Sequence, residues 1–138
     1  MSEKPTILVV DDDLPILTLM RSLLREFGFD PVTAIDREPS AVRSALRNAG
    51  ANAVAISAVC GDLIELLPAS ETLVANVPEG LIARLAGAVR HSTRRVVASG
   101  FHCAESADLV ELWAARGFAL RRRLDLAGWS ALLLERPS

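Results

Sequence analysis

Residues 6–13 constrain the fold of this chain more than any other stretch. An unbroken apolar run there ends abruptly in three aspartates, residues 11–13. A continuous apolar run of this kind is typical of a strand buried on both faces of a parallel sheet. Open α/β sheets bind their ligands at the carboxyl ends of such strands. The stretch therefore predicts an α/β domain whose first strand ends in acids at the ligand-binding edge.

The remainder of the chain alternates strand patterns with helix patterns. Residues 118–124 and 129–135 are two further strand patterns, and the four residues between them are too few for a crossover helix. These last strands must therefore pair antiparallel. The prediction is a single domain over residues 1–138, a three-layer α/β/α Rossmann-like sandwich. Its mostly parallel seven-stranded sheet ends in an antiparallel C-terminal hairpin. The other expected strands are 32–36, 53–57, 72–76 and 94–99, and the expected helices are 15–27, 39–49, 63–68, 78–89 and 106–116.

Charge and hydropathy narrow the classes of partner. The 15 basic and 17 acidic residues nearly cancel, so no broad basic face for nucleic acid is expected. Residues 1–5 contain no apolar signal core, and no apolar run approaches the length that spans a membrane. We therefore expect a soluble cytoplasmic protein with no nucleic-acid or membrane partner. No particular protein partner is indicated.

Several dispersed motifs occur in a characteristic order from residue 32 onward. Together they resemble class I S-adenosylmethionine (SAM) dependent methyltransferases, and most closely the enzymes that methylate a large-subunit ribosomal protein. This resemblance implies a SAM site along the carboxyl edge of the sheet and methyl transfer to a protein amine. The motifs are VTAIDREPSAV (32–42), GDL (61–63), LVANV (73–77), VASGF (97–101), ARGF (115–118) and GWSAL (128–132).

Three polar residues occupy the positions that matter in such an enzyme. Asp36 ends the second expected strand, where an acid can accept hydrogen bonds from ribose hydroxyls. The resemblance implies that Asp62 meets the adenine amino group, and that Asn76 lies beside the transferred methyl and orients the attacking amine as the catalytic residue. Each has a simpler alternative, since Asp36 and Asp62 could cap helices and Asn76 could belong to a turn.

The first 30 residues do not fit the methyltransferase pattern. These enzymes place a glycine-rich turn after the first strand, whereas no glycine precedes Gly28 here. Residues 7–16, ILVVDDDLPI, instead resemble the opening of a response-regulator receiver domain, which is flavodoxin-like. That resemblance implies a Mg²⁺ site on Asp11 and Asp12, because carboxylates suit a hard divalent cation. The acids could equally cap the next helix or remain solvated.

A complete receiver site is not expected from the remaining sequence. Phosphoryl transfer to an aspartate needs an acceptor at the end of the third strand, which here reads Ile56-Ser57-Ala58. Receivers also supply a lysine after the fifth strand, next to the phosphoryl oxygens. Residues 97–100 contain none, and Lys4 is the only lysine in the chain.

The preferred hypothesis is a recombined or engineered chimera. Residues 1–30 form a receiver-like βα unit joined to a methyltransferase-like remainder, residues 31–138. No cofactor is required, no turnover is expected, and at most weak SAM or nucleoside binding survives through Asp36 and Asp62. The three adjacent carboxylates should repel the carboxylate of SAM. The alternatives are an active SAM-dependent methyltransferase that acts on a protein amine, and a receiver-like Mg²⁺-binding module.

Three further expectations concern the tryptophans, the histidines and a run of arginines. Trp113 and Trp129 should both be largely buried core anchors. His91 and His102 show no pattern for metal or acid–base chemistry, so each should be a surface or cap residue. Residues 121–123 are three arginines on an expected strand, and they favour an exposed edge that discourages association between sheets.

Overall fold

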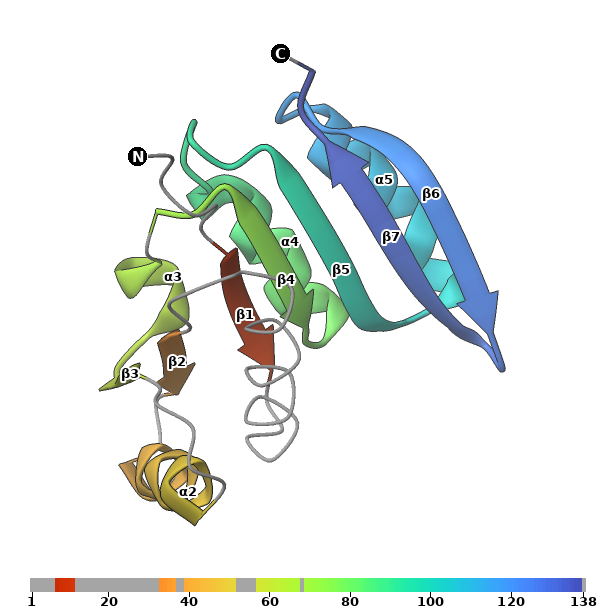
Figure 1. Cartoon of the computed structure of the whole chain (residues 1–138). Helices are drawn as coiled ribbons and strands as arrows, with labels where there is room; N and C mark the ends of the chain where they lie inside the picture. The colour runs from red at the N-terminus through yellow and green to blue at the C-terminus, as the bar shows by residue number, and fades with distance from the viewer. Residues whose placement is uncertain (1–6, 12–32, 37–38, 52–56, 68, 138) are drawn as a thin grey trace.

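The computed structural model describes residues 7–11, 33–36, 39–51, 57–67 and 69–137 (Figure 1). The described strands form two hydrogen-bonded sheets, one of five strands in the order β1-β4-β5-β7-β6 and one of two, β2-β3. The strands are β1 Ile7–Asp11, β2 Thr33–Asp36, β3 Ser57–Cys60, β4 Thr72–Asn76, β5 Arg95–His102, β6 Ala119–Leu126 and β7 Trp129–Glu135.

The prediction of one continuous seven-stranded sheet is therefore wrong for the described residues. Strands β1 and β2 contact each other, yet no hydrogen-bonded ladder joins them. The four described residues of β2 pair in parallel with β3, from Thr33 opposite Ser57 to Asp36 opposite Cys60.

The pairing directions confirm a mixed α/β, Rossmann-like fold with a reversed C-terminal hairpin. Strand β4 lies parallel to both β1 and β5, whereas β7 runs antiparallel to β5 and β6. The flavodoxin-like order 2-1-3-4-5 would place β1 next to β3, and among the described strands β1 pairs with β4 instead. The hairpin turn is tighter than expected, because Ala127 (φ 51°) and Gly128 (φ 84°) both take the positive φ values of a two-residue turn.

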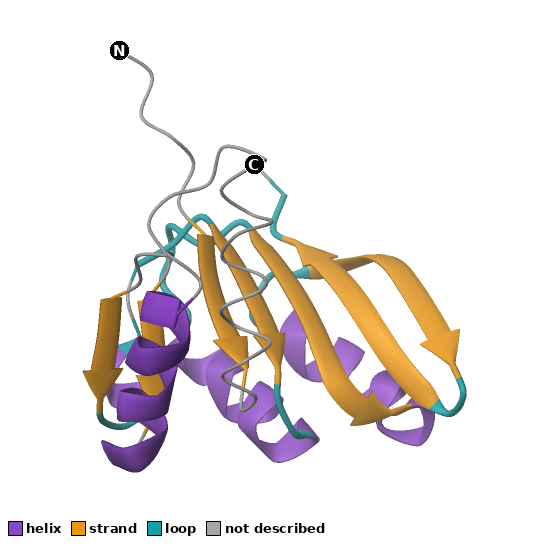
Figure 2. Ribbon diagram, turned by 60° about the horizontal axis from the view of Figure 1, so that its bottom comes forward, coloured by secondary structure: helices purple, strands orange, loops and turns teal. Residues whose placement is uncertain are grey.

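Two helices cover one face of the five-stranded sheet, as Figure 2 shows. They are α4, Glu79–Ala88, and α5, Ser106–Ala114, which follows the short 3₁₀ helix η1, Cys103–Glu105. Helix α2, Pro39–Ala51, packs against β2 and β3, and α3, Leu63–Leu66, forms one turn after β3. The helix expected at residues 15–27 lies outside the described residues. No helix in the described part of the chain is both long and apolar enough to cross a membrane.

The core lies between the five-stranded sheet and helices α4 and α5. Burial alternates along β4 and β7, and along β5 as far as Ser99, so every second residue of these stretches points into this layer. Trp113 of α5 is completely buried there, as the sequence predicts. The fully buried large side chains are Trp113, Phe101, Phe118, Leu73, Ile82, Leu85, Leu109, Leu132, Leu134 and Val96.

Strand β6 is the edge of the five-stranded sheet, and the three arginines are exposed on it as expected. All eight of its residues are exposed, including Arg121, Arg122 and Arg123. Positive charges along an open edge oppose pairing with a second sheet. His91 and His102 are also exposed as expected, and His102 is the N-cap residue of η1, with its backbone N–H donating to Glu105 Oε2 at 3.1 Å.

Candidate functional site

A cleft of about 670 Å³ opens where β4 and β5 end and the β6–β7 hairpin turns. This is the edge at which a Rossmann-like sheet binds ligands. Polar groups from β4 and β5 lie on one side of the cleft, and apolar side chains of the hairpin lie on the other. The residues that line it are Asn76, Val77, Pro78, Ser99, Gly100, Leu124, Leu126, Trp129, Ser130 and Ala131.

Asn76 takes the place that the sequence predicts, at the last position of β4. In register, Asp11 of β1 lies on one side of it and Ser99 of β5 on the other. The Ser99 hydroxyl donates a hydrogen bond of 3.1 Å to Asn76 Oδ1, which fixes the direction of the amide.

Gly100 is a site residue that the sequence reasoning missed. Its φ of +93° belongs to the left-handed region, and a Cβ there would lie 2.8 Å from both the backbone N and O of Val77. The β5–β7 register shifts between Ser99 and Phe101, so Gly100 sits in a bulge that brings β5 close to the end of β4. Gly100 directly follows the expected strand 94–99 but lies inside the observed strand β5, where a glycine is typical of a bulge or a close backbone approach.

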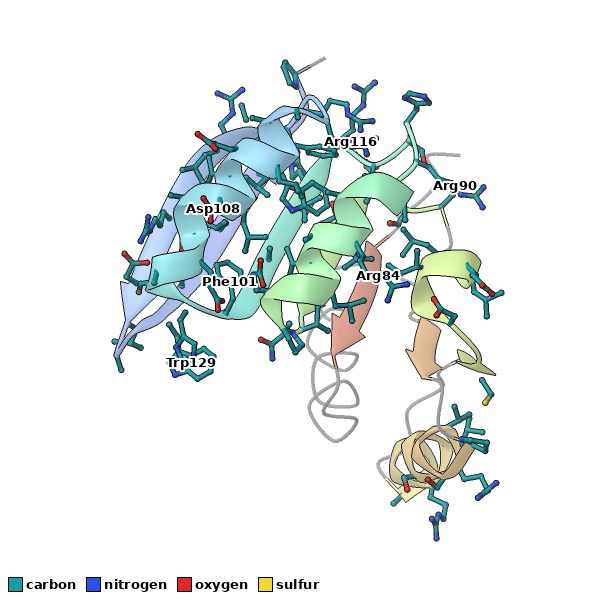
Figure 3. All side chains as sticks on the ribbon, turned by 180° about the vertical axis from the view of Figure 1, so that it is seen from behind. Arg84, Arg90, Phe101, Asp108, Arg116 and Trp129 are labelled. Carbon is teal, nitrogen blue, oxygen red and sulfur yellow. The ribbon has the colours of Figure 1, made fainter. Side chains whose placement is uncertain are left out.

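Trp129 forms the apolar wall of the cleft and is half exposed, at 50%. The prediction that it is a buried core anchor is wrong, because β7 alternates and turns Ser130, Leu132 and Leu134 inward. Its indole stacks on the ring of His102, with ring centroids 4.3 Å apart and an interplanar angle of 26°. Figure 3 shows Trp129 at the turn end of the hairpin.

A polar cluster holds the hairpin behind the cleft. Arg123 Nε donates to Asp125 Oδ1 at 3.0 Å, and the Ser130 hydroxyl donates to the same oxygen. These hydrogen bonds, with that of Arg123 the larger, hold the pKa of Asp125 below its usual value, and the Asp125 partner raises the pKa of Arg123. The backbone N–H of Cys103 donates to Gly128 O at 2.9 Å and ties the turn to η1.

Asp62 lies away from this cleft, directly after β3. Its Oδ1 accepts from the backbone N–H groups of Ile64, at 2.8 Å, and Glu65, at 3.3 Å. The simpler alternative from the sequence is thus confirmed, since Asp62 is the N-cap residue of α3. Because Asp36 pairs in register with Cys60, the backbones of Asp36 and Asp62 leave the two-stranded sheet at the same carboxyl edge.

The cap predicts a measurable stability effect. We expect Asp62→Ala to lower the free energy of unfolding by about 1 kcal/mol, because two backbone N–H groups lose their acceptor. Urea unfolding of the wild type and the variant measures this difference. Glu65→Ala is the matched control, since Glu65 is exposed in the same helix and its side chain is not the cap. Equal losses for the two variants would contradict the role of Asp62.

The metal prediction depends on residues that are only partly described. The backbones of Asp11 and Asp36 are described but their side chains are not, and Asp12 lies outside the described residues. Within the described ranges, no three histidine, cysteine, aspartate or glutamate side chains gather into a group that could hold a metal. The Mg²⁺ site on Asp11 and Asp12 stays a prediction from the sequence.

The strand order, the covering helices and the cleft at the end of β4 together define a mixed α/β, Rossmann-like methyltransferase fold. Solved structures with this fold include ribosomal protein L11 methylase from Lactobacillus delbrueckii subsp. bulgaricus. It superimposes with a TM-score of 0.79 and 20% sequence identity, over 100% of this chain and 73% of that one. TrmK of M. capricolum, in complex with the cofactor product S-adenosyl-homocysteine (SAH), gives a TM-score of 0.76 and 10% identity, over 100% of this chain and 65% of that one.

Sequence comparison adds no closer assignment. No family model matches this chain, and no curated protein matches it either. At 10 to 20% identity, the similarity to these two structures establishes the fold alone.

Proposed function

We propose that this chain is a methyltransferase-fold domain that binds S-adenosyl nucleosides weakly and does not transfer the methyl group. Asp36 and Asp62 would meet the ribose and the adenine at the carboxyl edge of β2 and β3. In this proposal residues 1–30 are a receiver-like unit recombined with the methyltransferase-like residues 31–138. The SAH complex of the TrmK structure supports the choice of ligand, because that protein shares the fold.

The position of Asp11 is the main support for the proposal that the chain does not transfer the methyl group. Asp11 ends β1 and pairs in register with Asn76, so the three consecutive acids begin directly beside the cleft. A methionine carboxylate brought to that edge meets negative charge instead of bare glycine backbone. Like charges a few ångströms apart repel strongly where water is partly excluded. Binding should then depend on the nucleoside half alone.

Calorimetric titration with SAH tests this proposal. We expect a dissociation constant on the order of 0.1–1 mM, which corresponds to about −4 to −5.5 kcal/mol. Asp36→Ala should weaken binding further, because the ribose hydroxyls lose their acceptor. Asp12→Asn combined with Asp13→Asn should strengthen it, because the repulsion falls. A micromolar constant, together with methyl transfer from SAM to a lysine-rich protein extract, would refute the proposal.

The cleft beside Asn76 favours a second candidate, a working SAM-dependent methyltransferase. Asn76 lines the cleft and its side chain is oriented by Ser99, as a residue that positions an acceptor must be. In that case labelled methyl would pass from SAM to an acceptor, and Asn76→Ala would abolish the transfer. The cytoplasmic location and the lack of nucleic-acid and membrane partners remain predictions from the sequence.

A further inference from the structure

We propose that an arginine cluster at the amino ends of β4 and β5 binds an acidic segment of a partner protein, a run of glutamate or aspartate side chains. The cluster lies at the end of the sheet opposite the candidate site, because β4 and β5 run from here towards Asn76 and Ser99. Figure 3 shows Arg90 and Arg116 at this end and Trp129 at the other. The arginine cluster consists of Arg90, Arg94, Arg95, Arg116, Arg121 and Arg136.

Arg136 ties the separate segments of the arginine cluster together. Its Nη1 donates to the backbone oxygens of Arg90, at 3.4 Å, and His91, at 3.2 Å, and its Nη2 donates to that of Arg116 at 3.4 Å. Its backbone N–H donates to Arg94 O at 2.9 Å. The loops that follow α4 and α5 therefore lie within the reach of one residue. A surface fixed in this way is preorganised for a ligand that contacts several arginines at once.

Three arginines of the cluster are exposed and available to a ligand. They are Arg90, Arg94 and Arg116, and none of the ion pairs between described residues involves them. Arg116 lies against the last turn of α4, since a Cβ built on Gly87 would be 3.6 Å from its Nη2. The partial negative charge at the end of a helix stabilises a cation there. This guanidinium is therefore held in place while it remains exposed.

Glu135 shows how the arginine cluster receives a carboxylate. Its Oε1 lies 3.4 Å from Arg95 Nε and its Oε2 lies 3.6 Å from Arg121 Nε, so one carboxylate bridges two strands. Both arginine side chains stay about half exposed, at 56% and 51%, and each has further N–H donors. Guanidinium forks suit carboxylates because they form paired hydrogen bonds with them. Glu71 and Glu135 are the acids at these strand ends, so the six arginines keep an excess of positive charge.

The surroundings of the arginine cluster favour a short acidic segment over a nucleic acid. Unpaired bases stack on exposed aromatic rings. The Phe118 ring is buried beneath Arg136, at 4.4 Å from its guanidinium carbon, and His91 offers a single imidazole. Helix α5, which leads to the cluster, carries the exposed acids Asp108 and Glu111. These acids would repel a polyanion that extends past the cluster.

Calorimetric titration with a capped hexaglutamate peptide tests the inference. We expect binding in about 50 mM NaCl and much weaker binding in about 500 mM NaCl, because salt screens exposed charges. SAH at saturation should leave the affinity for the peptide unchanged, since its proposed site lies at the carboxyl edge of the sheet. Loss of SAH binding with retained peptide binding would refute the nucleoside proposal alone. Absence of peptide binding at low salt would overturn the inference.

A matched pair of double variants locates the peptide site. Arg90→Gln combined with Arg94→Gln should weaken peptide binding about 2- to 30-fold, the loss expected for two exposed ion pairs. The control is Arg43→Gln combined with Arg47→Gln, because both arginines are exposed on α2 and the net charge changes equally. An unchanged urea midpoint shows that each variant is folded. If the two double variants bind the peptide equally, the arginine cluster is not the site and the inference fails.

Two other polyanions decide the class of partner. Hexauridylate carries a similar charge to the peptide, and vesicles of phosphatidylserine in phosphatidylcholine present a charged membrane surface. Tighter binding of hexaglutamate than of either one supports a protein partner. Tighter binding of hexauridylate or of the vesicles would overturn the inference, since the arginine cluster would then serve a nucleic acid or a membrane.

Discussion

Replacing Trp113 with alanine is expected to lower the free energy of unfolding by about 3–5 kcal/mol, the range for deleting a large buried aromatic side chain. Trp113 is completely buried on α5, where it meets Phe118 edge-to-face with centroids 5.3 Å apart. Arg136 covers the other side of that pair, with its guanidinium carbon 4.4 Å from the Phe118 ring centroid. Removal of the indole leaves a cavity that this closed layer cannot collapse to fill. The shift of the urea midpoint, at an unchanged slope, measures the loss.

Trp113→Phe is the informative control for this core position. Among the described residues, the indole Nε1 of Trp113 finds no hydrogen-bond partner although it is buried. Phenylalanine keeps an aromatic ring against Phe118 and removes the unsatisfied donor, whose burial costs about 1–3 kcal/mol. We therefore expect a much smaller loss than for alanine. A loss below about 1 kcal/mol for Trp113→Ala would show that this layer tolerates rearrangement, contrary to the close packing of protein cores.

Strong periodicity made most of the described elements predictable from the sequence. Residues 72–76 were expected as a strand and form β4 with the same limits, and the short link after residue 124 required the antiparallel hairpin. The limits of the third strand could not be predicted from the apolar pattern. Residues 53–60 are almost uniformly apolar, and such a run fixes neither start nor end. Of the strand expected at 53–57, residues 53–56 lie outside the described residues, and the described part, Ser57–Cys60, continues past the expected end in register with β2.

A residue of the candidate site could be predicted from the sequence only where its position along a strand determines its role. Asn76 is the last residue of the strand expected at 72–76, and it is also the last residue of β4. The residue type of Trp129 predicts a core position, whereas the two-residue alternation of β7 gives the buried position to Ser130. Gly100 was missed because its role arises from a contact with Val77, 23 residues earlier in the chain. Local patterns carry no information about such an approach between strands.

That approach makes Gly100→Ala the second large expected effect. At φ +93° a residue with a Cβ is strained by about 1–2 kcal/mol. The new methyl would also lie 2.8 Å from the backbone N and O of Val77, and these are not the flexible end of a side chain. Moving that backbone disturbs the hydrogen bond of 3.1 Å from Val77 N to Ser99 O. Together with the 1–3 kcal/mol typical of overpacking, we expect a loss of about 2–5 kcal/mol in the free energy of unfolding.

Gly80→Ala separates this local effect from the general effect of adding a methyl group. Gly80 lies in α4, and a Cβ built on it meets no atom within 4 Å, so alanine there should be neutral or slightly stabilising by helix propensity. The Gly100 variant should in addition move the Trp129 indole signal, because Asn76, Val77 and Trp129 line the same cleft. If the two glycine variants unfold at the same urea concentration, then β4 can withdraw from β5 at little cost. The cleft would then lack a fixed polar wall.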